Sequence, residues 1–197
     1  GWEITPEDTL CILRVALGRG IRFAEQLRLH GITTVNSRET NLLCDDKWLN
    51  YIVMKNAGLQ QPRSAILTHE ENIDIPIKEI GGKYPMILKT AQGLKRPIVS
   101  GDFRSNVSQG SLPLKMKLTE LEKSEILKAA KSVNGIWLGV DFIPSKDREK
   151  IPPYLIEVNS SPGTGHIDEI NGTDISKLVL DTFRNRDNWT LDKSTET

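Results

Sequence analysis

Two segments of this chain carry oxygen-bearing side chains within runs of apolar residues. In 136–143 the apolar residues alternate with others, which sends Asp141 to the face opposite the apolar one. The same alternation in 154–159 leaves Glu157 and Asn159 on one face, roughly 7 Å apart. Directly paired side chains of a hairpin lie about 5 Å apart, so we expect Asp141, Glu157 and Asn159 to converge on one spot.

Three oxygen donors at one spot would suit a divalent cation. Mg²⁺ in nucleotide enzymes takes a few hard oxygen ligands, and a central carboxylate can bridge two ions about 4 Å apart. The alternative is that polar residues simply cover an exposed strand face, which is the commoner case for a single aspartate. Facing acids repel each other, however, so the group of three favours a cation between them.

Cationic and small residues elsewhere could bind a phosphate or a carboxylate. Lys89 ends an apolar strand and Lys47 opens a helix, although each alone is more often a surface lysine. The glycine-flanked stretch 95–106 supplies arginines and an amide, which suits anions. The turn 160–165 consists of small residues whose backbone could approach a ligand. Ordinary solvated loops are the alternative for both stretches.

The elements that must position these residues are of both types, which indicates an α/β or α+β fold. A parallel βα unit comes first, Thr119 and Glu122 form a capping box, and a frayed polar tail begins at Asn185. The expected strands are 9–17, 32–35, 65–68, 86–89, 136–143 and 154–159. The expected helices are 23–29, 45–56, one opening at Thr119 and one capped by Asp174. The expected apolar side of the hairpin is Leu138, Val140, Phe142, Ile156 and Val158.

The composition excludes several classes of partner. Lys plus Arg (26) equals Asp plus Glu (26), so no field of one sign recruits nucleic acid or an acidic membrane. Cys11 and Cys44 match no metal-finger spacing and are expected to be reduced, buried thiols. No signal-peptide region and no run of about 18 apolar residues occurs. We therefore expect a soluble, cytoplasmic protein with neither nucleic acid nor a membrane as partner.

The same residues resemble those of one known family. The runs Gly139-Val-Asp-Phe-Ile143 and Leu155-Ile-Glu-Val-Asn-Ser-Ser-Pro-Gly163, preceded by Asp102-Phe-Arg-Ser-Asn106, resemble the ATP-grasp ligases of the RimK group. Upstream, Val35-Asn-Ser37, Asp46-Lys47 and Pro85-Met-Ile-Leu-Lys89 are similar to the start of that family's nucleotide-binding half. The likeness covers most of residues 32–180.

The resemblance implies a role for each matching residue. Asp141, Glu157 and Asn159 would hold Mg²⁺, as one ion or two, with Mn²⁺ as a substitute. Lys47 and Lys89 would contact ATP phosphates. The residues that would line the ATP and acyl-phosphate site are Arg104, Ser105 and Asn106, with Arg104 and Asn106 as the catalytic pair and Arg96 as a weaker candidate.

The resemblance also implies a fold and an activity. The fold would be ATP-grasp with a partial N-terminal pre-ATP-grasp domain, divided as 1–36, 37–93, 94–189 and a tail over 190–197. In the family ATP phosphorylates a carboxylate and an amine attacks the acyl phosphate, so we expect an ATP-dependent carboxylate–amine ligase that adds an amino acid, such as glutamate, to a peptide or protein terminus. The alternatives are another ATP-grasp peptide ligase or macrocyclase, a glutathione-synthase-like enzyme, and a non-catalytic nucleotide-binding module. The sequence does not name the acceptor, and a homo-oligomer is compatible with it.

Two departures from the family pattern bear on function. Where the family commonly continues with a histidine, a basic residue and two glycines, this chain reads Val107-Ser-Gln-Gly-Ser111, so the resemblance does not define the acceptor specificity. The family also separates its lysine strand from the Lys-Arg motif by several tens of residues, which carry a phosphate lid and a strand that reads adenine. Here Gly93 runs straight into Leu94. We expect that a lid segment is missing between these two residues, and a protein that truly lacked it would favour the binding module.

Overall fold

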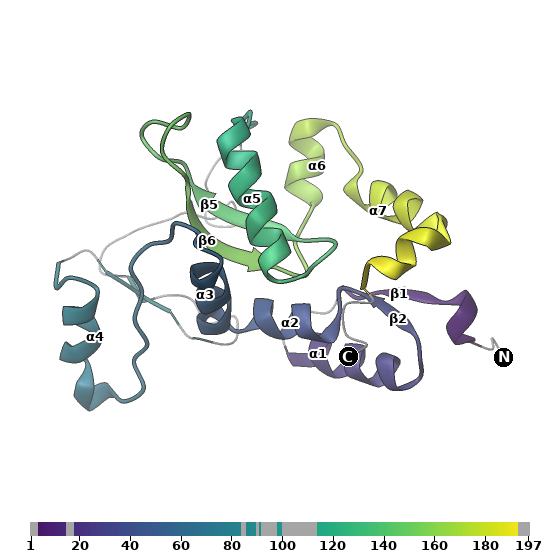
Figure 1. Ribbon diagram of the computed structural model, residues 1–197, viewed down its shortest axis with the longest axis horizontal. Helices are drawn as coiled ribbons and strands as arrows, with labels where there is room; N and C mark the ends of the chain where they lie inside the picture. Colours follow the sequence, from purple (N-terminus) through teal and green to yellow (C-terminus); the bar gives the residue numbers. More distant parts are fainter. Residues whose placement is uncertain are drawn as a thin grey trace.

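The computed structural model describes residues 4–14, 18–83, 86–89, 91, 98–99 and 114–192. Within these residues the strands form three two-stranded sheets flanked by helices (Figure 1). The strands are β1 (Leu10–Ile12), β2 (Thr33–Val35), β3 (Ile87–Leu88), β4 (Ile98–Val99), β5 (Gly139–Ile143) and β6 (Tyr154–Asn159). The α-helices are α1 (Gly18–Leu29), α2 (Arg38–Asp45), α3 (Lys47–Asn56), α4 (Asp74–Glu79), α5 (Glu120–Ser132), α6 (Gly165–Asn171) and α7 (Ile175–Arg184). The 3-10 helices include η1 (Pro6–Asp8), η2 (Glu70–Asn72) and η4 (Arg186–Asp192).

The N-terminal part is a parallel βα unit, as the order of elements predicted. β1 and β2 pair in parallel, so the carboxyl ends of both strands point the same way. The connecting helix α1 is followed by Gly31, whose φ of 72° is a left-handed conformation that suits glycine. β1 is shorter than the predicted strand over 9–17, of which residues 15–17 lie outside the described residues.

Two helices occupy the region where one was predicted over 45–56. Asp46 separates them, because its Oδ1 accepts hydrogen bonds from the backbone N–H groups of Trp48 (2.9 Å) and Leu49 (3.0 Å) and so caps α3. The preceding helix α2 was not predicted, although Ser37 caps it. The cap at Asp46 fixes the direction of α3 and places Lys47 at its first position.

The predicted capping box at the start of α5 is confirmed. Thr119 Oγ1 accepts from Glu122 N (3.1 Å), and Thr119 N donates to Glu122 Oε2 (2.9 Å). The buried Glu122 carboxylate also accepts two hydrogen bonds from the Arg148 guanidinium, both at 2.7 Å. These bonds, those from Arg148 first, lower the pKa of Glu122 to about 2. The pair ties α5 to the loop between β5 and β6.

The predicted hairpin is confirmed, but it contains a β-bulge. Asp141 pairs with Glu157, whereas the next pair is Phe142 with Leu155, so Ile156 has no partner on β5. The extra residue breaks the alternation of β6. Leu155 is buried with 0% exposure and Ile156 is only partly buried, so the predicted burial of Ile156 is wrong.

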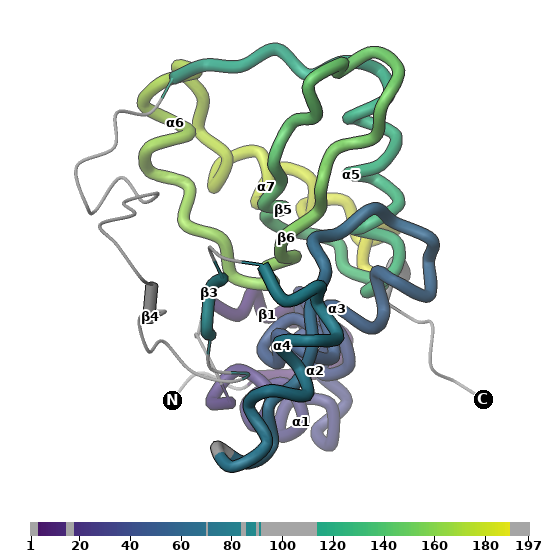
Figure 2. Tube along the Cα trace, turned by 90° about the vertical axis from the view of Figure 1, so that its left-hand side faces the viewer, coloured from purple at the N-terminus to yellow at the C-terminus, as the bar shows by residue number. Residues whose placement is uncertain are grey.

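The hydrophobic core lies where α3 and α5 pack on the hairpin (Figure 2). Cys44 belongs to this core, as predicted, whereas Cys11 is partly exposed, and both thiols are free. Burial, followed by the negative charges of Glu157 and Asp45, raises the pKa of Cys44 to about 12, so its thiol stays protonated. The buried core residues are Cys44, Met54, Leu59, Ala129, Val133, Leu155 and Val158.

Two further predictions about the chain are wrong. The stretch 65–68 is not a strand, and residues 186–192 form the 3-10 helix η4 rather than a frayed tail. η4 is held by Trp189, whose indole N–H donates to Phe183 O (2.8 Å). Among the described helices, none has the length and apolar character needed to cross a membrane.

Candidate functional site

The polar face of the β5–β6 hairpin carries the predicted metal ligands. Asp141 lies directly opposite Glu157, and Asn159 lies opposite Gly139, two positions further along the same face. Although the side chain of Asp141 reaches solvent, desolvation by the surrounding protein raises the pKa of its carboxyl. The charge of Glu157 raises this pKa further, and the charge of Lys89 opposes both effects. Two carboxylates therefore share one region, as the alternation predicted, and their role in metal binding stays a prediction.

Two lysines reach the same carboxylates from other parts of the chain. Lys47 Nζ lies 3.6 Å from Glu157 Oε1, and both side chains are about one-third exposed or less (32% and 26%). The backbone N–H of Lys47 also donates to Ala91 O at 2.8 Å, which brings the segment after β3 to the start of α3. This contact explains how Lys89, from that segment, comes close enough to act on Asp141. The structure thus brings together two predicted phosphate-binding lysines and two predicted metal ligands.

The turn after β6 fixes the third predicted ligand. Asn159 Oδ1 accepts a hydrogen bond from Ser161 N at 2.8 Å. Pro162 then folds back over Gly139 and lies so close that a Cβ at this glycine would be only 2.7 Å from Pro162 Cβ. The turn therefore requires glycine at position 139. The hydrogen bond from Ser161, a residue of this turn, orients the Asn159 amide. This gives the small-residue stretch 160–165 a structural role that the sequence alone did not define.

A buried asparagine that sequence reasoning did not select joins the hairpin to the N-terminal unit. Asn36, 2% exposed, donates from Nδ2 to Trp137 O (2.7 Å) and Ser160 O (2.9 Å). Its Oδ1 accepts from the backbone N–H groups of Ile136 (2.9 Å) and Trp137 (3.1 Å). One amide thus holds the residues that precede β5 and follow β6 against the end of β2. The only sequence signal for Asn36 was its place in a run that resembles the RimK group.

A second buried asparagine positions α3 on the hairpin. Asn50 Nδ2 donates to Leu43 O (3.1 Å) and Val158 O (3.2 Å), and its Oδ1 accepts from Val158 N (3.0 Å). Because Val158 lies between Glu157 and Asn159, this pairing fixes the distance between α3 and the two predicted ligands. A polar residue within a largely apolar helical face was the signal that could have revealed it.

The remaining predicted site residues lie outside the described residues. They are Arg96, Arg104, Ser105 and Asn106, together with the junction between Gly93 and Leu94. In the part of the chain that the structure describes, no three His, Cys, Asp or Glu side chains lie close enough to hold a metal ion. The candidate set has two carboxylates and one amide, all hard oxygen donors, and its chemistry fits Mg²⁺.

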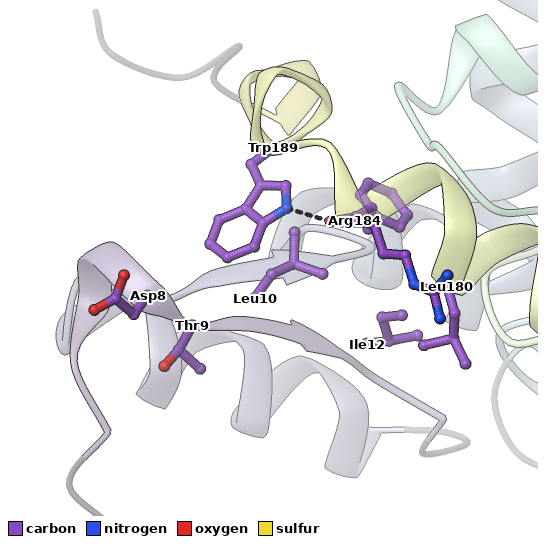
Figure 3. A pocket seen from close by; sticks show the side chains of 8 residues that line it. Asp8, Thr9, Leu10, Ile12, Leu180, Arg184 and Trp189 are labelled. Carbon is purple, nitrogen blue, oxygen red and sulfur yellow. Dashed lines mark hydrogen bonds between the residues drawn. The ribbon is translucent and has the colours of Figure 1, made fainter.

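A pocket lies elsewhere, between the N-terminal strand and the C-terminal helices. In this pocket Trp189 lies over Leu10, and Leu180 lies beside Ile12 (Figure 3). None of its lining residues belongs to α3, β3, β5 or β6, so it is separate from the candidate site. Its lining residues are Asp8, Thr9, Leu10, Ile12, Leu180, Phe183, Arg184 and Trp189.

Comparison with known proteins defines the fold. The structure of a RimK domain ATP-grasp protein from Sphaerobacter thermophilus DSM 20745 matches with a TM-score of 0.64 and 15% identity, and the match covers 87% of this chain and 80% of that one. The fold of this chain is the ATP-grasp fold. Within that class, residues 92–183 match the family model of the RimK-like ATP-grasp domain.

Two relatives show how much of such a protein the chain represents. It is 36% identical over 108 residues to the probable alpha-L-glutamate ligase 2 of Shewanella denitrificans, which is 53% of this chain and 35% of the relative. It is 23% identical over 217 residues to a probable alpha-L-glutamate ligase of Vibrio parahaemolyticus, which is 82% of this chain and 70% of the relative. The chain thus spans about a third of the first relative. The second comparison is longer than the 197 residues of the chain, so that relative has residues there that this chain lacks.

Proposed function

We propose that this chain is the nucleotide- and metal-binding part of an ATP-dependent carboxylate–amine ligase. One observation carries the proposal: two lysines and two carboxylates from three separate segments meet on the polar face of the hairpin. Lys47 lies 3.6 Å from Glu157, and the charge of Lys89 acts on Asp141. The RimK-like family match and the relatives described as probable alpha-L-glutamate ligases support this reaction class. The proposal keeps the predicted division into 1–36, 37–93, 94–189 and 190–197.

The proposed reaction joins a carboxylate to an amine in two steps. The γ-phosphoryl group of ATP passes to a carboxylate oxygen, which releases ADP and gives an acyl phosphate. The amine then attacks the acyl carbon, phosphate leaves, and loss of a proton from nitrogen gives the amide. Such transfer needs charge neutralisation and alignment more than a protein nucleophile, which suits this set of residues. The proposed product is a peptide or protein terminus extended by an amino acid such as glutamate.

Each group of residues has a part in this proposal. Lys47 and Lys89 bind phosphate oxygens as compact positive charges. Asp141, Glu157 and Asn159 would hold Mg²⁺, which when bound would neutralise phosphate charge. The residues proposed for the acyl-phosphate site are Arg96, Arg104, Ser105 and Asn106.

A direct assay tests the proposal. The purified protein is incubated with ATP, Mg²⁺, L-glutamate and a short peptide that has a free C-terminus, and ADP release and peptide mass are followed together. A ligase gives ADP and a peptide longer by one glutamyl residue, and EDTA prevents both. Replacing glutamate by other amino acids tests which amine is joined, and omitting the peptide tests whether a peptide carboxylate is needed. ADP release without any coupled product, across all amino acids and peptides, would rule out the ligase.

A second candidate is a nucleotide-binding module without turnover. It is favoured by the 217-residue comparison, which exceeds the length of this chain, and by a family match that begins at residue 92, beside the predicted junction. Without a lid the phosphates would stay exposed to water, which removes much of the catalytic stabilisation. Calorimetric titration with ATP and Mg²⁺ separates the two candidates. Binding with no ADP formation supports the module, and binding with turnover supports the ligase.

A further inference from the structure

Arg14 occupies a distinctive place at the end of the N-terminal sheet. It follows β1, whose alignment with β2 continues through the hydrogen bond from Leu13 N to Val35 O (2.8 Å). Ligands of parallel α/β units commonly bind beyond the carboxyl ends of the strands. The guanidinium of Arg14 lies over the ring of Trp137, with Cζ 4.4 Å from the ring centroid. The exposed Arg14 is therefore held by an aromatic platform at a position where ligands are expected.

Hydrogen bonds of its backbone connect Trp137 to the candidate metal site. Trp137 donates its backbone N–H to Asn36 Oδ1 and accepts at its carbonyl from Asn36 Nδ2. The same Nδ2 also donates to the carbonyl of Ser160, the residue directly after Asn159. One buried amide thus holds both the Arg14 platform and the chain that bears a proposed metal ligand.

Arg14 has charge available for a ligand. Among the described residues, Arg28, Arg38, Arg148 and Arg184 pair with carboxylates, but no carboxylate pairs with Arg14. A guanidinium over an aromatic ring uses its flat face, which leaves N–H groups at its edge for a planar acceptor. A carboxylate is planar and accepts two such hydrogen bonds side by side.

We propose that Arg14, supported by Trp137, recognises a carboxylate of the amino acid or peptide substrate. This inference rests on the proposed ligase function and adds a substrate-recognition element to it. A nucleotide phosphate could also bind an arginine, but the lysines proposed for phosphates approach the hairpin from α3 and β3. Arg14 instead approaches from the end of β1, and in Figure 1 the helix α2 lies between α3 and the β1–β2 sheet. The carboxylate of the substrate is therefore the favoured ligand.

Binding and kinetics of Arg14→Met test the inference, with Arg22→Met as the matched control. Arg22 is an exposed arginine of α1. The probes are L-glutamate, L-glutamine, isoglutamine and a short peptide ending in glutamate with a free or an amidated C-terminus. We expect Arg14→Met to weaken binding of one carboxylate probe by about tenfold or more, while the matching amide binds both proteins equally. The Kd for ATP is expected to change less than about twofold, and Arg22→Met is expected to match the wild type.

The outcomes separate this inference from the proposed function. If Arg14→Met instead weakens the binding of ATP, Arg14 binds phosphate and the inference is overturned. The inference is also overturned if Arg14→Met weakens the binding of the acid and the amide probes equally, or if the wild-type protein binds none of the probes. Failure of the wild-type protein to turn over ATP would contradict the ligase, whereas direct binding of the probes still decides the role of Arg14. Trp137→Phe keeps an aromatic face and is expected to lose less affinity than Arg14→Met, which separates recognition from misfolding.

Discussion

Lys47 Nζ lies 3.6 Å from Glu157 Oε1, so one carboxylate oxygen serves both an ammonium group and, in our proposal, a metal ion. A divalent cation at Glu157 competes with Lys47 for this oxygen. Nucleotide phosphates, in contrast, would attract Lys47 away from it. The two ligands are therefore expected to favour each other's binding, since each provides the charge that the other displaces.

Lys47→Met is expected to change the two affinities in opposite directions. Mn²⁺ binding without nucleotide should tighten by about two- to fivefold, the range of a partly exposed ion pair. ATP binding should weaken by about tenfold, because a charge-assisted contact to phosphate is lost. Electron paramagnetic resonance of Mn²⁺ and calorimetry of ATP measure the two constants. Weaker binding of both Mn²⁺ and ATP would show that Lys47 does not compete with the metal.

Asp141→Asn is expected to stabilise the protein in EDTA and to abolish its stabilisation by metal. Desolvation, followed by the nearby Glu157 charge, raises the pKa of Asp141, so at pH values where the carboxyl is ionised its charge destabilises the folded state relative to the unfolded state. Removing this charge should raise Tm by about 1–2 °C without metal. Thermal unfolding with EDTA and with Mg²⁺ measures both effects. Lys150→Met, which removes an exposed charge outside the site, is the control for a general charge effect.

The Glu122–Arg148 pair predicts a loss of stability in acid. Because the folded state holds the pKa of Glu122 at about 2, below its ordinary value of 4.5, the contribution is complete above about pH 4.5 and is lost as pH falls towards 2. Arg148 is about one-third exposed, and solvent screening reduces the contribution to roughly 2 kcal/mol. Urea unfolding from pH 6 to 2.5 compares the wild type with Glu122→Gln. The difference in unfolding free energy between the two proteins should shrink as the pH falls across this range. A constant difference would contradict the role of the Glu122–Arg148 pair.

Gly139→Ala is expected to disturb the turn that orients Asn159. The new Cβ would come within 2.7 Å of Pro162 Cβ, and a proline ring cannot rotate away. We expect a loss of about 1–3 kcal/mol in unfolding free energy together with weaker Mn²⁺ binding. Gly165→Ala is the control, because no atom lies within 4 Å of a Cβ at that position. Equal effects of the two substitutions would show that the close approach of Pro162 is not what matters.

Local patterns predicted the parts of this structure that depend on neighbouring residues. Alternation placed Asp141 and Glu157 on the same face of the hairpin, and the capping box at Thr119 marked the start of α5. The position of Lys47 at the start of α3 followed from the aspartates before it. These features depend on periods and caps that lie within a few residues of one another.

Features that depend on distant contacts could not be predicted in this way. The bulge at Ile156 inserts one residue into a regular strand, and nothing in the local alternation indicates it. Asn36 and Asn50 each bond to residues about one hundred positions away, so their roles appear only when the hairpin packs on them. The helix η4 is held by hydrogen bonds from the side chains of Asn188 to Thr182 O and of Trp189 to Phe183 O, which give no periodic signal in the sequence.

The Asn50 amide has a consequence for the behaviour of the protein in solution. An uncovered strand edge presents N–H and C=O groups that can pair with the same edge of another molecule and start aggregation. On the outer edge of β6, Asn50 bonds both the N–H and the C=O of Val158, and the carbonyl of Gln60 accepts from Leu155 N. A side chain and a loop thus take the place of a neighbouring strand. These contacts protect the edge of the hairpin next to the candidate metal ligands from pairing with a strand of another molecule.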